Sequence, residues 1–144
     1  MGWNVILASV VVSAAVSATV SIIITKMNIH AKRKDFRYAK LYDILTEIQE
    51  YQAPPLRPLE DQTTNDITNQ HVMYYSFLIG KFDLSKPLLS NKIIEEIDAE
   101  LKEHNLLDVN LETFREVYIE RFRFNVEFRR TITKGIQKQL TKLK

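Results

Sequence analysis

Residues 3–25 read WNVILASVVVSAAVSATVSIIIT, and this stretch decides how the rest of the chain is organised. It contains no charged residue, no proline and no glycine. As an α-helix it would be roughly 34 Å long, slightly more than the hydrocarbon core of a bilayer. Inside lipid every backbone amide must be hydrogen-bonded within the segment, so a single apolar stretch of this length has to be helical. The sequence therefore predicts a transmembrane anchor in residues 1–25.

A cleaved signal peptide is the main alternative for this stretch. Such peptides have a basic region, then a shorter apolar run and a cleavage site of small residues. Here no basic residue precedes the apolar run, although Ser13, Ala14 and Ala18 resemble a cleavage site. A core helix that is apolar all round would need a large surrounding domain, and Ile6 breaks the myristoylation pattern. We therefore favour an anchor that is not cleaved.

Small residues recur at four-residue steps along the predicted anchor. Each such step rotates about 40° around a helix, so the small side chains form a slanting groove. Grooves of this kind let two membrane helices approach closely, and serine hydroxyls can bond across the contact. Alternatively, the hydroxyls bond back to carbonyls of their own helix. We favour a contact with a second copy or another membrane protein, through Ser9, Ser13, Ala14, Ser17, Ala18 and Ser21.

Charge is partitioned along the chain in a way that the net charge of +2 conceals. Residues 26–40 hold six basic residues and one acidic residue. Residues 41–128 hold eight basic and 17 acidic residues, and residues 129–144 hold six basic residues and no acidic residue. Because the positive charge nearest the anchor follows it, the positive-inside rule places residues 26–144 in the cytoplasm and the N-terminus outside. In a bacterial host the membrane would be the inner membrane. The acidic middle argues against nucleic acid as a partner, because it would repel phosphates.

Residues 26–34, KMNIHAKRK, are expected to continue the helix out of the bilayer as a basic juxtamembrane extension. Their charges either fix the topology alone or also contact anionic lipid headgroups. The C-terminal end of the chain is basic and amphipathic, so it either lies on an anionic membrane surface or is a bundle helix with lysines in its last turns. The residues predicted for topology and lipid contact are Lys26, Lys32, Arg33, Lys34, Arg129, Arg130, Lys134, Lys138 and Lys142.

Residues 35–144 predict one small all-α cytoplasmic domain, a bundle of about four helices of which the last is long. Only 3 glycines and 4 prolines interrupt the chain, which favours long helices. In residues 35–52 the apolar positions have helical spacing. We expect them to face inward: Tyr38, Leu41, Tyr42, Leu45, Ile48 and Tyr51. Residues 53–65 form a polar loop that contains prolines.

Two further helices are predicted before the last one. The first begins near Thr64 or Asn65 and ends before Pro87, and the second runs from Asn91 to about His104 with Ser90 as its N-cap. The first should bury Ile67, His71, Tyr74, Tyr75, Leu78 and Phe82, and the second Ile93, Ile94, Ile97 and Leu101. The outer side of the second is acidic and expected to face solvent, through Glu95, Glu96, Asp98, Glu100 and Glu103.

The last helix is predicted from about Leu111 to Leu143, with Gly135 as the place where a kink is easiest. Its apolar stripe comprises Leu111, Phe114, Tyr118, Phe122, Ile132, Ile136, Leu140 and Leu143. Residues 122–128 also alternate as a strand would. Because a lone strand has no partner elsewhere in the chain, helix is the preferred interpretation.

The sequence carries no pattern typical of catalysis, so we expect no enzyme activity, no cofactor and no metal. It lacks a phosphate loop, a dinucleotide fingerprint and a serine nucleophile elbow. Cysteine is absent, the three histidines are dispersed, and His71 is better explained as a hydrogen-bonded core residue than as a ligand. The leading hypothesis is a membrane-anchored helical interaction or scaffold module that associates with itself or with another membrane protein through the Ser/Ala stripe. Its domain would also present an acidic surface to a cytoplasmic protein. The alternative is a toxin-like or defence-type effector whose oligomerised anchor perturbs the bilayer.

Overall fold

The computed structural model describes residues 3–55, 63–103 and 118–144, and all of its regular structure is helical. These residues form helices α1 (Trp3–Glu50), α2 (Thr64–Ser85), α3 (Asn91–Glu103) and α5 (Tyr118–Leu143), with a 3-10 turn, η1, at Lys86–Leu88. The chain divides into two compact units, Met1–Arg37 and Tyr38–Lys144, and α1 contributes to both. The predicted all-α fold with a small helical bundle is confirmed.

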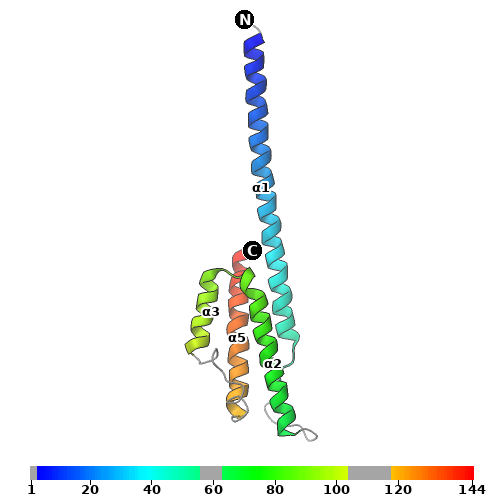
Figure 1. The fold of residues 1–144 in the computed structure, drawn as a ribbon, viewed down its shortest axis with the longest axis vertical. Coiled ribbons are helices and arrows are strands. Elements are labelled where there is room, and N and C mark those ends of the chain that lie inside the picture. The colour runs from blue at the N-terminus through cyan, green and yellow to red at the C-terminus, as the bar shows by residue number, and fades with distance from the viewer. Residues whose placement is uncertain (1–2, 56–62, 104–117) are drawn as a thin grey trace. The chain divides into compact units, whose positions relative to one another are not determined.

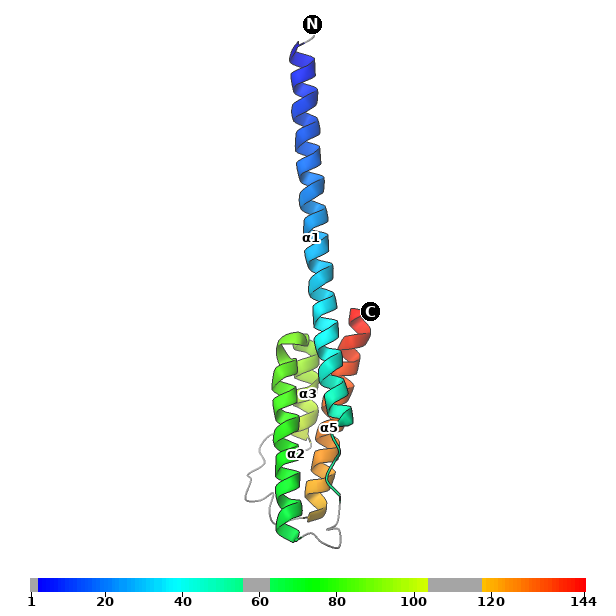
Figure 2. The same ribbon diagram turned by 90° about the vertical axis from the view of Figure 1, so that its right-hand side faces the viewer.

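The second unit is a bundle in which α2, α3 and α5 lie side by side in both views (Figures 1 and 2). Its core takes one face from each helix and from the end of α1. The buried apolar residues are Leu41, Ile44, Leu45 and Ile48 of α1, Tyr74, Tyr75, Leu78 and Phe82 of α2, Leu89, Ile93, Ile97 and Leu101 at α3, and Phe128, Ile132, Ile136 and Leu140 of α5. Residues three and four apart on a helix share a face, which is why the periodicity of the sequence located this core.

Two of the tyrosines that were expected to face inward from residues 35–52 are exposed. Tyr42 is 54% exposed and Tyr51 is 40% exposed, whereas Ile44, which the prediction omitted, is buried. Tyr42 stacks on Tyr38 at the edge of the bundle, with ring centroids 6.3 Å apart. Tyr51 follows the last helical residue and packs its ring against Phe77 at 4.2 Å. Both tyrosines therefore pack their rings on a neighbouring aromatic ring and stay partly exposed to solvent.

Helix α2 begins at Thr64, as predicted, and a capping box holds its first turn. The Thr63 hydroxyl accepts a hydrogen bond from the Asp66 backbone N–H at 3.3 Å, and the Asp66 carboxylate accepts one from the Thr63 backbone N–H at 2.9 Å. Both bonds satisfy donors that the start of a helix leaves without a partner. The hydrogen bonds from Thr63 also lower the pKa of the Asp66 carboxyl.

Replacing Thr63 with alanine should weaken the bundle by about 1 kcal/mol at neutral pH, because the cap is lost. The carboxyl pKa of Asp66 is lowered in the folded chain, so its contribution is present above the ordinary pKa and is lost as pH falls through the lowered one. The variant should therefore lose less stability than the wild type on acidification. Urea unfolding in a non-ionic detergent, at neutral and acidic pH, measures both effects. Equal acid sensitivity in the two proteins would contradict this account of Asp66.

Helix α3 starts where it was predicted, but its cap is not the expected one. The Ser90 hydroxyl is buried and has no hydrogen-bond partner. Instead the Ser90 backbone N–H donates to the Gln139 side-chain oxygen at 3.0 Å, and the Ser90 carbonyl accepts from Ile93 and Ile94. A side chain of α5 thus fixes the start of α3, a long-range contact that local capping rules do not contain.

The last helix resolves the ambiguity of residues 122–128 in favour of helix. Helix α5 continues through Gly135 without interruption. Gly135 is a contact point between helices, because a Cβ atom built there would overlap the Ile97 side chain of α3. The predicted start near Leu111, and the burial of Leu111 and Phe114, fall outside the residues that the structure describes.

Candidate functional site

Helix α1 is long and apolar enough to cross a membrane, by length and composition. Every described side chain from Val11 to His30 is exposed, and Val11, Val12, Val16 and Val20 are between 48% and 65% exposed. The apolar surface of this segment is therefore not covered by the described parts of the chain. Large exposed apolar surfaces on a protein mark contact with lipid or with a partner.

The small residues of the predicted packing stripe lie on this exposed segment. Ser13, Ala14, Ser17, Ala18 and Ser21 are all exposed, and the side chain of Ser9 falls outside those described. Among the hydroxyl side chains of residues 11–30, Thr19 donates to the Ala15 carbonyl at 2.8 Å, and no such bond is recorded for the three serines. The interhelical contact of this stripe therefore stays a prediction.

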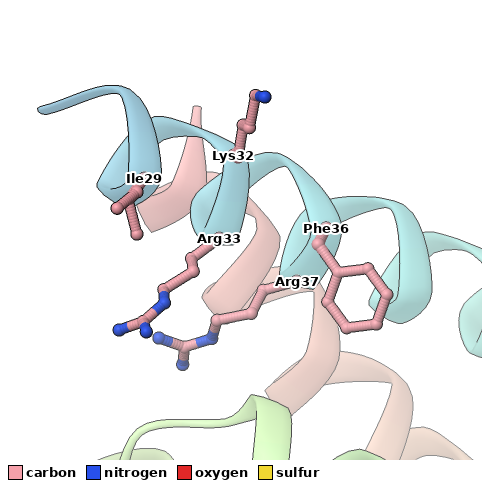
Figure 3. A pocket seen from close by; sticks show the side chains of 5 residues that line it. All are labelled: Ile29, Lys32, Arg33, Phe36 and Arg37. Carbon is pink, nitrogen blue, oxygen red and sulfur yellow. The ribbon is translucent and has the colours of Figure 1, made fainter. Parts of the chain in front are cut away.

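The first unit carries a pocket of about 360 Å³ that is lined by Ile29, Lys32, Arg33, Phe36 and Arg37. We call this set the juxtamembrane cluster. In Figure 3 the guanidinium groups of Arg33 and Arg37 lie next to each other on one side of the helix, whereas Lys32 points away. Ile29 and Phe36 flank the two arginines and are 47% and 58% exposed. The cluster thus combines two planar cations with apolar surface.

Arginine pairs of this kind suit phosphate groups. A guanidinium group presents several N–H donors in a fixed plane and can bind two phosphate oxygens at once. Sequence reasoning selected Lys26, Lys32, Arg33 and Lys34 but missed Arg37 and Phe36. The four-residue spacing from Arg33 to Arg37 was the available signal, because residues at that spacing are neighbours on a helix.

Several of the basic residues at the C-terminal end have partners within the bundle. Lys134 pairs with Glu100 at 3.2 Å, Lys138 with Glu96 at 2.5 Å, and Arg130 with Glu127 at 3.5 Å. Arg129 donates to the Gln49 carbonyl at 3.0 Å. Lys142 is exposed. The hydrogen bond from Lys138 lowers the pKa of the Glu96 carboxyl.

These pairs also change the description of α3 and α5. Glu96 and Glu100 belong to the side of α3 that was expected to face solvent, yet both carboxylates pair with lysines of α5. The apolar face of α5 is buried, with Ile132 and Ile136 both fully covered. Helix α5 is therefore a bundle helix, and its apolar side is occupied by the core instead of being presented to a membrane surface.

His71 is the one histidine that the bundle buries among the described residues, and it is a hydrogen-bonded core residue, as expected. It is 1% exposed, and its Nε2 lies 3.2 Å from the Pro55 carbonyl oxygen. Its Nδ1 lies 3.2 Å from the Asn125 side-chain nitrogen. A carbonyl can only accept and an amide nitrogen can only donate, so the neutral ring carries its proton on Nε2. No group of three or more potential metal-ligating side chains is found within the described ranges.

No family model, no curated protein and no solved structure matches this chain. Function must therefore be inferred from its own residues. The features that bear on function are the exposed apolar helix, its stripe of small residues and the juxtamembrane cluster.

Proposed function

We propose that the chain is a single-pass membrane protein that holds a helical interaction module at the cytoplasmic face of a membrane. The observation that carries this proposal is an uncharged helical segment, residues 11–25, in which every side chain is exposed, whereas residues 38–144 form a core of their own. A bundle with its own core has no need of this segment for folding. Exposed apolar residues over such a length are stable in lipid.

The orientation follows from the charges next to the span. The juxtamembrane cluster adds two adjacent guanidinium groups to the basic residues that follow residue 25. Positive residues are retained on the cytoplasmic side during insertion, and there they meet anionic headgroups at about 1 kcal/mol each. Residues 26–144 would thus face the cytoplasm, with the inner membrane as the location in a bacterial host.

The orientation is tested by fusing reporters to the C-terminus of the full chain in bacteria. A green fluorescent protein fusion should fluoresce, and an alkaline phosphatase fusion should be inactive, because the phosphatase folds only outside the cytoplasm. Changing Lys26, Lys32, Arg33 and Lys34 to glutamine should raise the phosphatase signal, since the topology determinant is weakened. An active phosphatase fusion of the unchanged chain would overturn the proposed orientation.

In the proposed module, the small-residue stripe supplies the contact within the membrane. Ser13 and Ser17 lie one turn apart with hydroxyls that make no bond within the described helix. A second copy or another membrane protein could pack its backbone into this groove. The bundle would then present its exposed carboxylates, such as Glu95 and Glu103, to a soluble protein partner.

Filling the stripe should abolish self-association if the partner is a second copy. We expect Ser13→Ile with Ser17→Ile to reduce the signal of a membrane dimerisation reporter severalfold, because the added side chains keep the two backbones apart. Val12→Ile with Thr19→Ile is the matched control, since both residues lie on the opposite face of the same helix. Equal signals from the two double variants would show that the stripe does not direct self-association.

A further inference from the structure

A groove on the bundle combines cationic side chains with buried hydroxyl groups that lack partners. It has a volume of about 540 Å³ and lies among residues of the end of α1, α2 and α5, all within the second unit. Its walls include Gln49, Tyr74, Arg129, Arg130, Thr133 and Lys134. None of the described residues that line it is acidic, although residues 41–128 are strongly acidic as a whole.

Two buried hydroxyls on the walls of this groove have no acceptor for their protons. The hydroxyl oxygens of Tyr74 and Thr133 are among five buried side-chain polar atoms of the described chain that have no partner. Tyr74 is only 1% exposed. A buried hydroxyl without a partner weakens a fold, and a valine or phenylalanine of the same shape would remove that penalty. Two such groups in one groove are readily explained if a ligand completes their hydrogen bonds.

The guanidinium group of Arg129, which also lines the groove, is held in place by a hydrogen bond. Arg129 donates one N–H to the Gln49 carbonyl at 3.0 Å, which fixes its guanidinium group and leaves further donors on the same plane. Burial raises the pKa of the Tyr74 hydroxyl, whereas the positive charge of Arg129 and a hydrogen bond with its side chain oppose that rise, so Tyr74 keeps its proton as a donor. The second arginine, Arg130, has a loose 3.5 Å pair with Glu127 and a side chain that is 69% exposed.

From these groups we infer that the groove is a binding site for a small phosphomonoester, whose phosphate oxygens accept hydrogen bonds from Tyr74, Thr133, Arg129 and Arg130. A phosphate is favoured over a carboxylate because three terminal oxygens can satisfy donors that converge from two helices and two guanidinium groups. The volume lies within the range of about 300–1,000 Å³ typical of small-molecule sites. It leaves room for an organic group against Ala53 and Val126, which also line the groove.

The phosphate could belong to a soluble compound or to a lipid headgroup, and the test separates the two. The full chain in a non-ionic detergent is titrated with phenyl phosphate and with inorganic phosphate by calorimetry. In parallel, its melting temperature is compared in nanodiscs of phosphatidylcholine with and without phosphatidic acid. Saturable binding of either soluble compound assigns a soluble ligand, and a rise in melting temperature with phosphatidic acid assigns a lipid headgroup.

Three groove variants and one control variant show whether the phosphate probes bind in the groove. Thr133→Val and Tyr74→Phe should each weaken binding by about tenfold or more, since each removes a hydrogen bond to a charged group. Thr133→Val should not lower the melting temperature of the ligand-free protein, because it removes a hydroxyl without a partner. Arg130→Gln should weaken binding as well, whereas Arg123→Gln, an exposed arginine of the same helix outside the groove, should not.

The proposal fails if neither phosphate probe nor phosphatidic acid binds or stabilises the protein. It also fails if Thr133→Val and Tyr74→Phe bind as the wild type does, which would make the orphaned hydroxyls structural. A phosphatidic acid effect that both variants retain would assign that lipid to the juxtamembrane cluster and remove it from the groove.

Discussion

Aspartate at positions 12 and 16 is expected to release the chain from the membrane. Val12 and Val16 lie near the middle of the uncharged stretch and are 61% and 57% exposed. A charged residue near the centre of a spanning helix opposes insertion by about 2.5–3.5 kcal/mol, so two should oppose it by about 6 kcal/mol. That corresponds to a shift of roughly 10⁴-fold in the partition between membrane and water. The fraction of protein in the membrane pellet after alkaline carbonate extraction measures the effect.

The matched control for this experiment is Val12→Leu with Val16→Leu, which keeps both positions apolar. The control should remain in the pellet. Neither position belongs to the core of residues 38–144, so the melting of the bundle by circular dichroism should be the same in the aspartate variant and the control. If the aspartate variant stays in the pellet at the control's level, α1 does not span the membrane and its exposed apolar surface serves another contact.

The helices of the bundle were predictable because their apolar residues repeat with the period of an α-helix. Ile93, Ile97 and Leu101 show this best, since all three are buried on one side of α3 as their spacing requires. The start of α2 was also predictable, because threonine and aspartate at capping-box spacing are a local signal. Residues 122–128 illustrate the limit of periodicity, since they fit both strand and helix until the rest of the chain is considered.

What the sequence did not reveal depends on contacts between elements. Ile44 is buried and Tyr42 is exposed because of where the edge of the bundle lies, and the sequence of a single helix does not show that edge. Ser90 is a good cap by local rules, but Gln139 of α5 takes over the start of α3. The groove on the bundle is the feature that the sequence shows least, because Tyr74 and Thr133 come from different helices. Only the packing of α2 against α5 places both residues on the walls of one groove.

Gly135 illustrates how a residue can be noticed in the sequence for the wrong reason. Glycine in a helix suggests a kink because it lacks helix propensity. The structure instead uses the missing side chain, since a Cβ atom at position 135 would overlap Ile97 Cδ1 and lie 2.7 Å from Ile97 Cγ1. Because residue 135 has no side chain, helix α3 can lie closer to α5 there than a Cβ atom would allow.

Alanine at position 135 should consequently destabilise the bundle, although alanine is the best helix former. Helix propensity alone would favour the change by about 1 kcal/mol. Overpacking against a buried side chain opposes it by about 1–3 kcal/mol, and Ile97 is only 3% exposed, so it has little room to move. We expect a net loss of up to about 2 kcal/mol. Urea unfolding of the full chain in a non-ionic detergent measures it.

Gly80→Ala is the matched control, because Gly80 lies inside α2 and a Cβ atom there meets nothing within 4 Å. This variant should gain about 0.5–1 kcal/mol, the ordinary benefit of replacing an exposed helical glycine. The two glycine-to-alanine changes should thus have opposite signs. If both stabilise the protein, α3 and α5 are not in close contact at Gly135.

A second substitution locates the strain at one atom. Ile97→Val removes Cδ1, the atom that the new methyl group would overlap, and by itself should weaken the core by about 0.5–1.5 kcal/mol. In the double variant the shorter of the two overlaps is gone, although the γ carbon of residue 97 at 2.7 Å remains. The combined loss should therefore be smaller than the sum of the two single losses by at least about 0.5 kcal/mol. Additive losses would place the cost of Gly135→Ala elsewhere, at the remaining γ carbon, in the backbone of α5 or against Ile93, whose Cγ2 lies 3.5 Å from the same Cβ position. Coupling of the expected sign would show that the close approach of α3 and α5 depends on this single missing side chain.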